Sequence, residues 1–169
     1  IHRFGWTEGL VGISLAVVGL LVGAVQGGLI RVVNPRLGDE KSIYLGLLLY
    51  TLGLALFAFA SEGWMMFVFL IPYCLGGIAG PSLQSTISNH VPPNEQGELQ
   101  GALTSLMSLT TIIGPLIMNN LFKYFTTDKA PFYFPGVSFL LGALLMMLSV
   151  FIAWKVLSKE KNTVVPKII

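Results

Sequence analysis

Charged side chains are scarce in this sequence. Only 11% of its 169 residues are Asp, Glu, Lys or Arg, whereas 54% are hydrophobic. A water-soluble domain carries about 25% charged residues, because its surface must stay hydrated. The shortage excludes water as the main solvent of the protein, and the mean hydropathy of +0.77 agrees with this. We therefore expect most of the molecular surface to face lipid.

Residues that carry catalysis or bind metals are also rare. The chain has one cysteine, Cys74, and two histidines, His2 and His90, which lie far apart in sequence. No nucleophile and base pair, metal-ligand spacing or phosphate-binding glycine loop occurs. The sequence therefore predicts no enzyme activity, no cofactor and no metal site. The single cysteine excludes a disulfide within the chain, and a net charge of only +2 argues against nucleic-acid binding.

Long apolar runs fill most of the chain instead. A helix needs about 20 apolar residues to cross the hydrocarbon core of a bilayer. Five runs of this kind occur, separated by short breaks rich in turn-forming residues. We predict an all-α bundle of about five transmembrane helices, at residues 7–33, 42–60, 63–90, 95–122 and 132–157. Residues 1–158 would form one transmembrane domain, and residues 159–169 a cytoplasmic tail.

Basic residues are distributed unevenly between the two sets of predicted loops. One set contains Arg31, Arg36, Lys41, Lys155, Lys159, Lys161 and Lys167, and the other contains only Arg3, Lys123 and Lys129. Cytoplasmic loops of membrane proteins are enriched in Lys and Arg. The bias therefore predicts that the C-terminus is cytoplasmic and that the N-terminus is on the outside.

Polar residues recur along one face of the fourth predicted span. Together with the helix-breaking Pro115 they are spaced three or four residues apart, at Gln100, Thr104, Ser108, Thr111 and Asn119. Polar groups are costly in hydrocarbon unless they have partners, so this face should point into the bundle or into a water-filled cavity. Two interpretations stay open: the face lines a substrate path, or its hydroxyls bond to their own helix and let neighbours approach. Gln26 and Gln84, in the first and third spans, are further candidates for the path.

Helix-breaking residues before Gln84 indicate a gate or hinge. Gly76, Gly77 and Gly80 permit bending, and Pro81 frees a backbone carbonyl from its helical hydrogen bond. Glu98 falls in the first turn of the fourth span, where an acid stabilises the helix dipole. Since Arg31 and Arg36 are predicted at the same surface as Glu98, a latch between these charges is the alternative role.

Several motifs resemble those of one transporter family. Gln96-Gly97-Glu98-Leu99-Gln100-Gly101, followed by Gly114-Pro115, resembles the start of the eleventh helix in tetracycline/proton antiporters of the major facilitator superfamily. The segment from Gly76 to Gln84 is similar to their tenth helix. Phe4-Gly5-Trp6 and Arg36-Leu37-Gly38-Asp39 are similar to that family as well.

The resemblance implies that the five spans correspond to helices eight to twelve of a twelve-helix fold. It implies a fragment of a secondary transporter in the bacterial inner membrane, which with its N-terminal half exports an amphipathic small molecule by proton-coupled alternating access. Gating and structural roles would fall to Arg31, Arg36, Gly38, Asp39, Pro81, Gln96, Gly97, Glu98, Gly101, Gly114 and Pro115.

One departure from the family concerns proton coupling. Some members carry a His in the first of these spans and an Asp in the second, where this chain has Val22 and Tyr50. Because intramembrane acids and histidines are the usual proton relays, coupling is expected in the remaining half of the transporter. The alternative function, from another class, is a small stand-alone membrane scaffold or assembly subunit.

Overall fold

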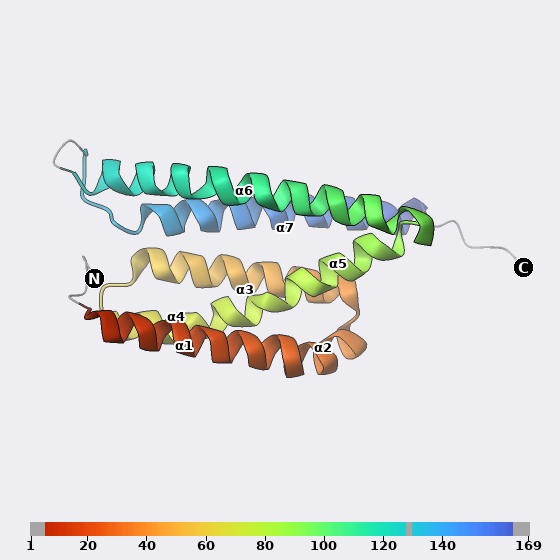
Figure 1. Ribbon diagram of the computed structural model, residues 1–169, viewed down its shortest axis with the longest axis horizontal. Helices are drawn as coiled ribbons and strands as arrows, with labels where there is room; N and C mark the ends of the chain where they lie inside the picture. Colours follow the sequence, from red (N-terminus) through yellow and green to blue (C-terminus); the bar gives the residue numbers. More distant parts are fainter. Residues whose placement is uncertain (1–5, 128–129, 164–169) are drawn as a thin grey trace, which may run out of the picture.

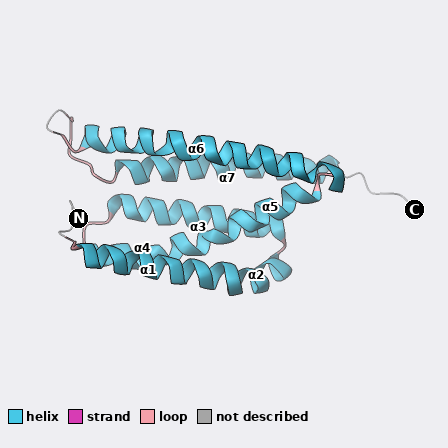
Figure 2. Cartoon of the chain, viewed as in Figure 1, coloured by secondary structure: helices cyan, strands magenta, loops and turns pink. Residues whose placement is uncertain are grey.

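The computed structural model describes the backbone of residues 6–127 and 130–163 and the side chains up to residue 159. Within these ranges every regular element is a helix, and no strand occurs (Figure 2). Five helical segments are long and apolar enough to cross a bilayer: Glu8–Leu37, Asp39–Phe59, Gly63–Asn89, Pro93–Phe125 and Val137–Lys159. The structure confirms the predicted all-α bundle with five spans.

The spans run alongside one another in alternating directions (Figure 1). The first consists of α1 (Glu8–Ala24), the π-helical segment η1 (Val25–Leu29) and α2 (Ile30–Leu37), and the second is α3 (Asp39–Phe59). The third consists of α4 (Gly63–Leu75), the 3-10 segment η2 (Gly76–Ile78) and α5 (Ala79–Asn89). A 3-10 turn, η3 (Pro93–Glu95), leads into α6 (Gln96–Phe125), and α7 (Val137–Thr163) is the fifth.

The helix ends differ from the predicted bounds mainly in the first and last spans. α2 continues through Pro35 to Leu37, although Asn34-Pro35 has the composition of a turn. The turn itself is reduced to Gly38, whose φ of 80° suits a residue without a Cβ atom. At the other end of the chain, α7 begins at Val137, and its helix extends to Thr163.

α3 forms the centre of the bundle, because it packs against α4, α5 and α7. One buried cluster, near the start of α3, consists of Ile43, Leu47 and Ala79. A second cluster, near its other end, contains Phe57, whose ring centroid lies 5.6 Å from that of Tyr73 and 5.6 Å from that of Phe139. Since lipid is as apolar as these side chains, close packing rather than exclusion from water holds such contacts together.

Small residues allow the backbone of α3 to approach the third span closely. A Cβ atom on Gly46 would lie 2.6 Å from the Ala79 nitrogen, and one on Gly53 would lie 2.8 Å from the Tyr73 Cα. Both distances are shorter than carbon atoms tolerate, so glycine is required at these two positions. At these two positions the backbones of α3 and the third span therefore pack directly against each other.

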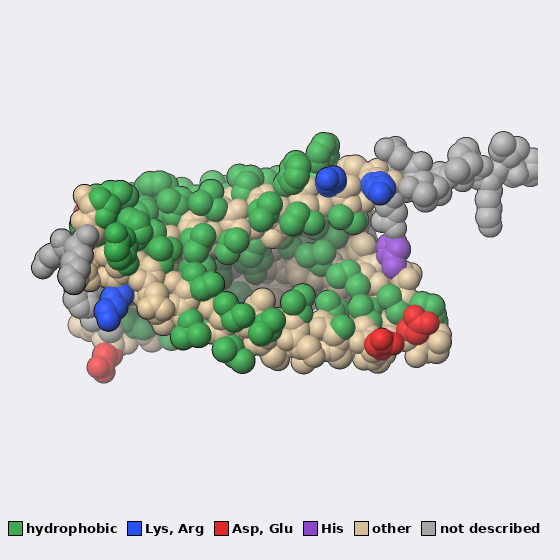
Figure 3. All heavy atoms as spheres, turned by 90° about the horizontal axis from the view of Figure 1, so that it is seen from above, with side chains coloured by type: hydrophobic (Ala, Val, Ile, Leu, Met, Phe, Trp, Pro, Cys, Tyr) green, Lys and Arg blue, Asp and Glu red, His purple; other side chains and the backbone are tan. Residues whose placement is uncertain are grey.

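α6 has a different environment, because none of its residues is buried. It packs chiefly against α7, where Ser138 Oγ donates a hydrogen bond of 2.9 Å to the Met118 carbonyl. Large apolar side chains such as Met107 and Ile112 are more than half exposed. In Figure 3 hydrophobic side chains cover the flank of the molecule and charged ones lie near its two ends, as expected for a chain surrounded by lipid.

Candidate functional site

The predicted path residues come from three elements of the bundle. Gln26 lies on η1, Gln84 lies on α5, and the others lie on α6. All seven side chains are exposed: Gln26, Gln84, Gln100, Thr104, Ser108, Thr111 and Asn119. Because α6 is exposed on its apolar face as well, exposure alone does not separate a path from a lipid-facing surface.

Hydroxyl groups along the polar face of α6 bond to their own helix. Ser108 Oγ donates to the Thr104 carbonyl at 2.9 Å, and Thr111 Oγ1 donates to the Met107 carbonyl at 2.8 Å. The amides of Gln100 and Asn119 make no hydrogen bond to any residue that the structure describes. The hydroxyls of Ser108 and Thr111 therefore have partners without water, whereas the two amides are available to a ligand, to water or to another part of the protein.

Two irregular helical segments lie against each other within the bundle. η1 contains Gln26 and contacts η2, the 3-10 segment that precedes Pro81. Pro81 lies in the first turn of α5, where its missing N–H leaves the Gly77 carbonyl without its usual donor and accounts for the local departure from α-helix. An irregular segment, Gly76–Ile78, thus lies just before the proline, where the sequence predicts a hinge, and the hinge role itself stays a prediction.

Four polar side chains join three spans at the end of the molecule where α2 meets α3. The Asn34 amide on α2 donates to Asp39 Oδ1 at 3.0 Å, and Asp39 is the first residue of α3. From α5, Ser82 Oγ donates to Asn34 Oδ1 at 3.1 Å and Ser85 Oγ donates to Asp39 Oδ2 at 2.6 Å. We call Asn34, Asp39, Ser82 and Ser85 the polar clasp.

Of the polar clasp, only Asp39 is among the residues that the sequence predicts to have a structural role. Asn34 lies just after the first predicted span, 7–33, and the two serines have no long polar stripe around them. Ser82 and Ser85 are three residues apart, so they lie on one face of a helix next to the predicted hinge. This spacing is the one feature of the sequence that could have indicated a polar contact there.

Gln96 connects the third and fourth spans. Its Nε2 atom donates to the carbonyls of Ser88 and Val91, at 2.7 and 2.8 Å, at the end of α5. Glu98 lies in the first turn of α6, as the sequence indicates. Added Cβ atoms at Gly97, Gly101 and Gly114 would meet open space, and Pro115 is an exposed residue within α6.

The predicted charge latch is open in this structure. Arg31, Arg36 and Glu98 are exposed, and no salt bridge joins them within the described ranges. The latch therefore remains a prediction for a different conformation.

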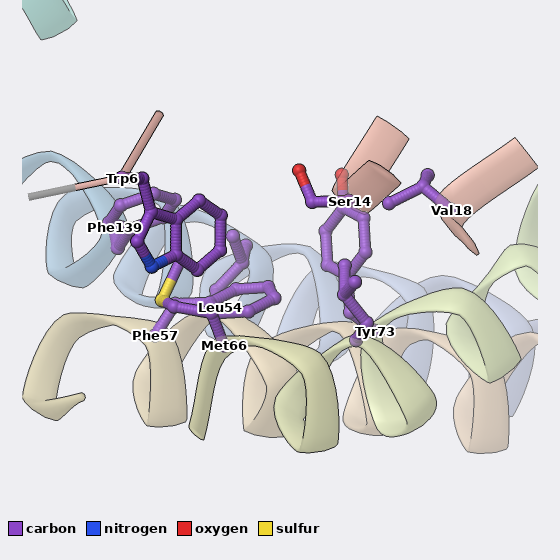
Figure 4. Close-up of a pocket in the computed structure, with 9 residues that line it drawn as sticks. Trp6, Ser14, Val18, Leu54, Phe57, Met66, Tyr73 and Phe139 are labelled. Atoms are coloured by element: carbon purple, nitrogen blue, oxygen red, sulfur yellow. The ribbon is translucent and has the colours of Figure 1, made fainter. Parts of the chain in front are cut away.

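Several apolar cavities lie beside α7, and two of them reach the centre of the bundle at α3. A cavity of about 320 Å³ is lined by residues from α1, α3, α4 and α7, and Figure 4 shows Tyr73 extending toward Ser14 at one side and Trp6 next to Phe139 at the other. A larger cavity, of about 720 Å³, lies between α3, α5 and α7, with His90 on its wall. No group of three His, Cys, Asp or Glu residues that could hold a metal ion occurs among the described residues.

This chain is similar to a known protein family and to several known proteins. Residues 1–166 match the family model of the Major Facilitator Superfamily. The chain is 37% identical over 145 residues to the Tetracycline resistance protein, class C, of Escherichia coli, which covers 86% of this chain and 35% of that protein.

Two further relatives are also matched over only about a third of their own length. The Tetracycline resistance protein, class E, of Escherichia coli is 42% identical over 122 residues, covering 72% of this chain and 30% of that protein. The Hippocampus abundant transcript-like protein 1 of Homo sapiens is 26% identical over 153 residues, covering 82% of this chain and 30% of that protein. The chain therefore spans about a third of the length of the relatives it matches.

Proposed function

This chain belongs to the Major Facilitator Superfamily, and from that premise we propose that it is part of a secondary transporter that exports amphipathic small molecules by alternating access. Its polar α6 face, with η1 and Gln84, would form one wall of the central path. In this mechanism two halves of a transporter rock about a substrate site near the middle of the membrane.

The observation that carries this proposal is the polar face of α6. It runs along a helix that has no buried residue, and the Gln100 and Asn119 amides have no partner in the described part of the chain. Such groups are costly in hydrocarbon, so a surface of this kind favours contact with water, substrate or another protein segment.

The partner that would complete the path is the N-terminal half of the same transporter. The length of the relatives supports this, because the segments that match this chain cover only 30–35% of those proteins. The exposed α6 and the cavity of about 720 Å³ beside α7 are surfaces that further helices would cover. From the bacterial relatives we propose the inner membrane as the location, and from the positive-inside bias we propose a cytoplasmic C-terminus.

Proton coupling in this proposal is assigned to the other half. The spans described here contain no Asp, Glu or His in their central parts, since Asp39 and His90 lie at helix ends. Export from everted vesicles that carry the full-length protein should therefore be abolished by a protonophore. It should survive replacement of His90 by Gln.

Thiol accessibility tests the wall of the path. Single cysteines at Ser108 and Thr111, on the polar face of α6, are expected to react with a membrane-impermeant maleimide in the full-length protein, and substrate should slow the reaction. Cysteines at Leu109 and Ile113, on the opposite side of the helix, are matched controls and should react poorly. Equal labelling of both faces would contradict the proposed path.

The mass of the native gene product distinguishes the transporter from the alternative, a small membrane scaffold. A native gene product of more than twice 18.3 kDa supports a twelve-helix transporter. A product near the mass of this chain, without any efflux, favours the scaffold.

A further inference from the structure

The segment α2 is weakly attached to the rest of the bundle. None of its residues is buried, and Asn34 makes the side-chain hydrogen bonds that connect it to other helices within the described ranges. The π-helical segment η1 precedes it, and added Cβ atoms at Gly27 and Gly28 would meet open space. Because glycine and a π-turn both weaken a helix at one point, α2 can bend away from the bundle about η1.

α5, on the other side of the polar clasp, is held firmly. Ser82 is fully buried, and the start of α5 lies in backbone contact with α3 at Gly46. The polar clasp therefore joins a weakly packed segment to a rigid one. Because no side chain of α2 is more than partly buried, these polar contacts contribute a large share of what holds α2 in place.

The hydrogen bonds of the polar clasp fix the role of each atom. An ionised carboxylate only accepts hydrogen bonds, so the Asn34 Nδ2 group must face Asp39, which leaves Asn34 Oδ1 for the Ser82 hydroxyl. Ser82 Oγ also lies 3.0 Å from the Ile78 carbonyl on its own helix. A hydroxyl has one proton and can donate to one of these two acceptors at a time.

Because the Ile78 carbonyl is a second acceptor, the buried Ser82 hydroxyl keeps a hydrogen bond even when the polar clasp is open. When Asn34 leaves, Ser82 can donate to Ile78, and Asn34 and Asp39, which are only half-buried, can be hydrated. We propose that the polar clasp, unlike the predicted charge latch, is itself a reversible latch. In its closed state it holds α2 against α3 and α5. In its open state α2 can swing about η1, which widens this end of the bundle. This inference rests on the proposed function, in which such an opening alternates with closure.

An exchange of two side chains tests the latch. Asn34→Asp places two carboxylates at hydrogen-bonding distance and should open it, because like charges repel and neither can donate. In the double variant N34D/D39N the amide at position 39 donates to the carboxylate at position 34, and both serines keep an acceptor. This variant should therefore close the latch again. Asn94→Asp, at an exposed position at the same end of the molecule, is the matched control for added charge.

The readout is the distance between spin labels at Val32 on α2 and Asn89 on α5, both exposed, in the full-length protein with its native cysteines replaced. Asn34→Asp should raise the population at longer distance by about tenfold, which corresponds to about 1.4 kcal/mol. The double variant and Asn94→Asp should match the parent. An unchanged distribution in Asn34→Asp, or a double variant as open as the single one, overturns the latch.

A pair of serine variants covers the case in which Asn34→Asp fails to fold. Ser82→Ala removes one hydrogen bond of the polar clasp, whereas Ser42→Ala changes an equally buried serine whose hydroxyl has no partner among the described residues. Only Ser82→Ala should lengthen the distance, and equal effects would exclude the latch. The distance between the spin labels can be measured without any transport, so it tests the latch independently of the proposed function. If the variants change this distance as expected but the full-length protein exports nothing, the latch is supported and the proposed function is refuted.

Discussion

α3 and α6 are both apolar helices of one bundle, but their surroundings are opposite. In the most hydropathic stretch of Asp39–Phe59, 44% of residues are buried, against 0% in that of Pro93–Phe125. α3 contacts the third span through glycines that no larger residue can replace without displacing backbone. α6 contains three glycines as well, and all three face open space.

The difference shows that residue type does not by itself assign a role within a membrane helix. A glycine on α3 determines how closely two helices approach, whereas a glycine on α6 has no such effect inside this chain. In the same way, Ser82 joins two helices, but Ser108 bonds only to its own helix. Within the described residues α6 packs chiefly against α7, so the rest of its surface faces lipid, water or another part of the protein.

The largest effect that tests this comparison is expected at Gly46. Gly46→Ala places a methyl group against the Ala79 backbone, and overpacking of this kind costs about 1–3 kcal/mol. Gly101→Ala on α6 is the control, and it should stabilise the helix by up to about 1 kcal/mol, since Ala is the better helix former. Thermal unfolding in detergent, followed by circular dichroism, measures both, and a stable Gly46→Ala variant would contradict the close contact.

A smaller effect is expected from the glutamines at the start of α6. Gln96→Ala removes two hydrogen bonds to the end of α5, each worth about 0.5–1.5 kcal/mol. Gln100→Ala, one turn further along the same helix, removes none within the described chain and should change stability by less than about 0.5 kcal/mol. The same unfolding assay compares them, and an equal loss would mean that Gln100 has a partner in the folded protein.

Much of the fold could be predicted from the sequence, because apolar length in a bilayer requires helices. The five spans, an irregular helical segment before Pro81 and the position of Glu98 in a first turn all follow from composition and local chemistry. The helix through Pro35 could not be predicted in this way, since proline usually marks a helix end. The chain turns instead at Gly38, whose φ of 80° suits a glycine.

The candidate site was less predictable than the fold. The polar face of α6 has a clear spacing, and the structure places those residues on one exposed helix. The polar clasp has no such period, because Asn34 and Ser82 are 48 residues apart in sequence and meet only in the packed bundle. Contacts of this kind depend on which faces of α3 and α5 come together, and that depends on the glycines between them.

The smallest change in stability is expected from a serine on the polar face. Ser108→Ala removes a hydrogen bond to its own helix and adds a better helix former, so the free energy of unfolding should change by less than about 0.5 kcal/mol. Ser138→Ala is the matched variant, because its hydroxyl joins α7 to the Met118 carbonyl on α6, and it should cost about 1 kcal/mol. If Ser108→Ala destabilises the full-length protein as much as Ser138→Ala does, the polar face is packed against another segment. In that case α6 resembles α3 more than its exposure suggests, and the face is not a path.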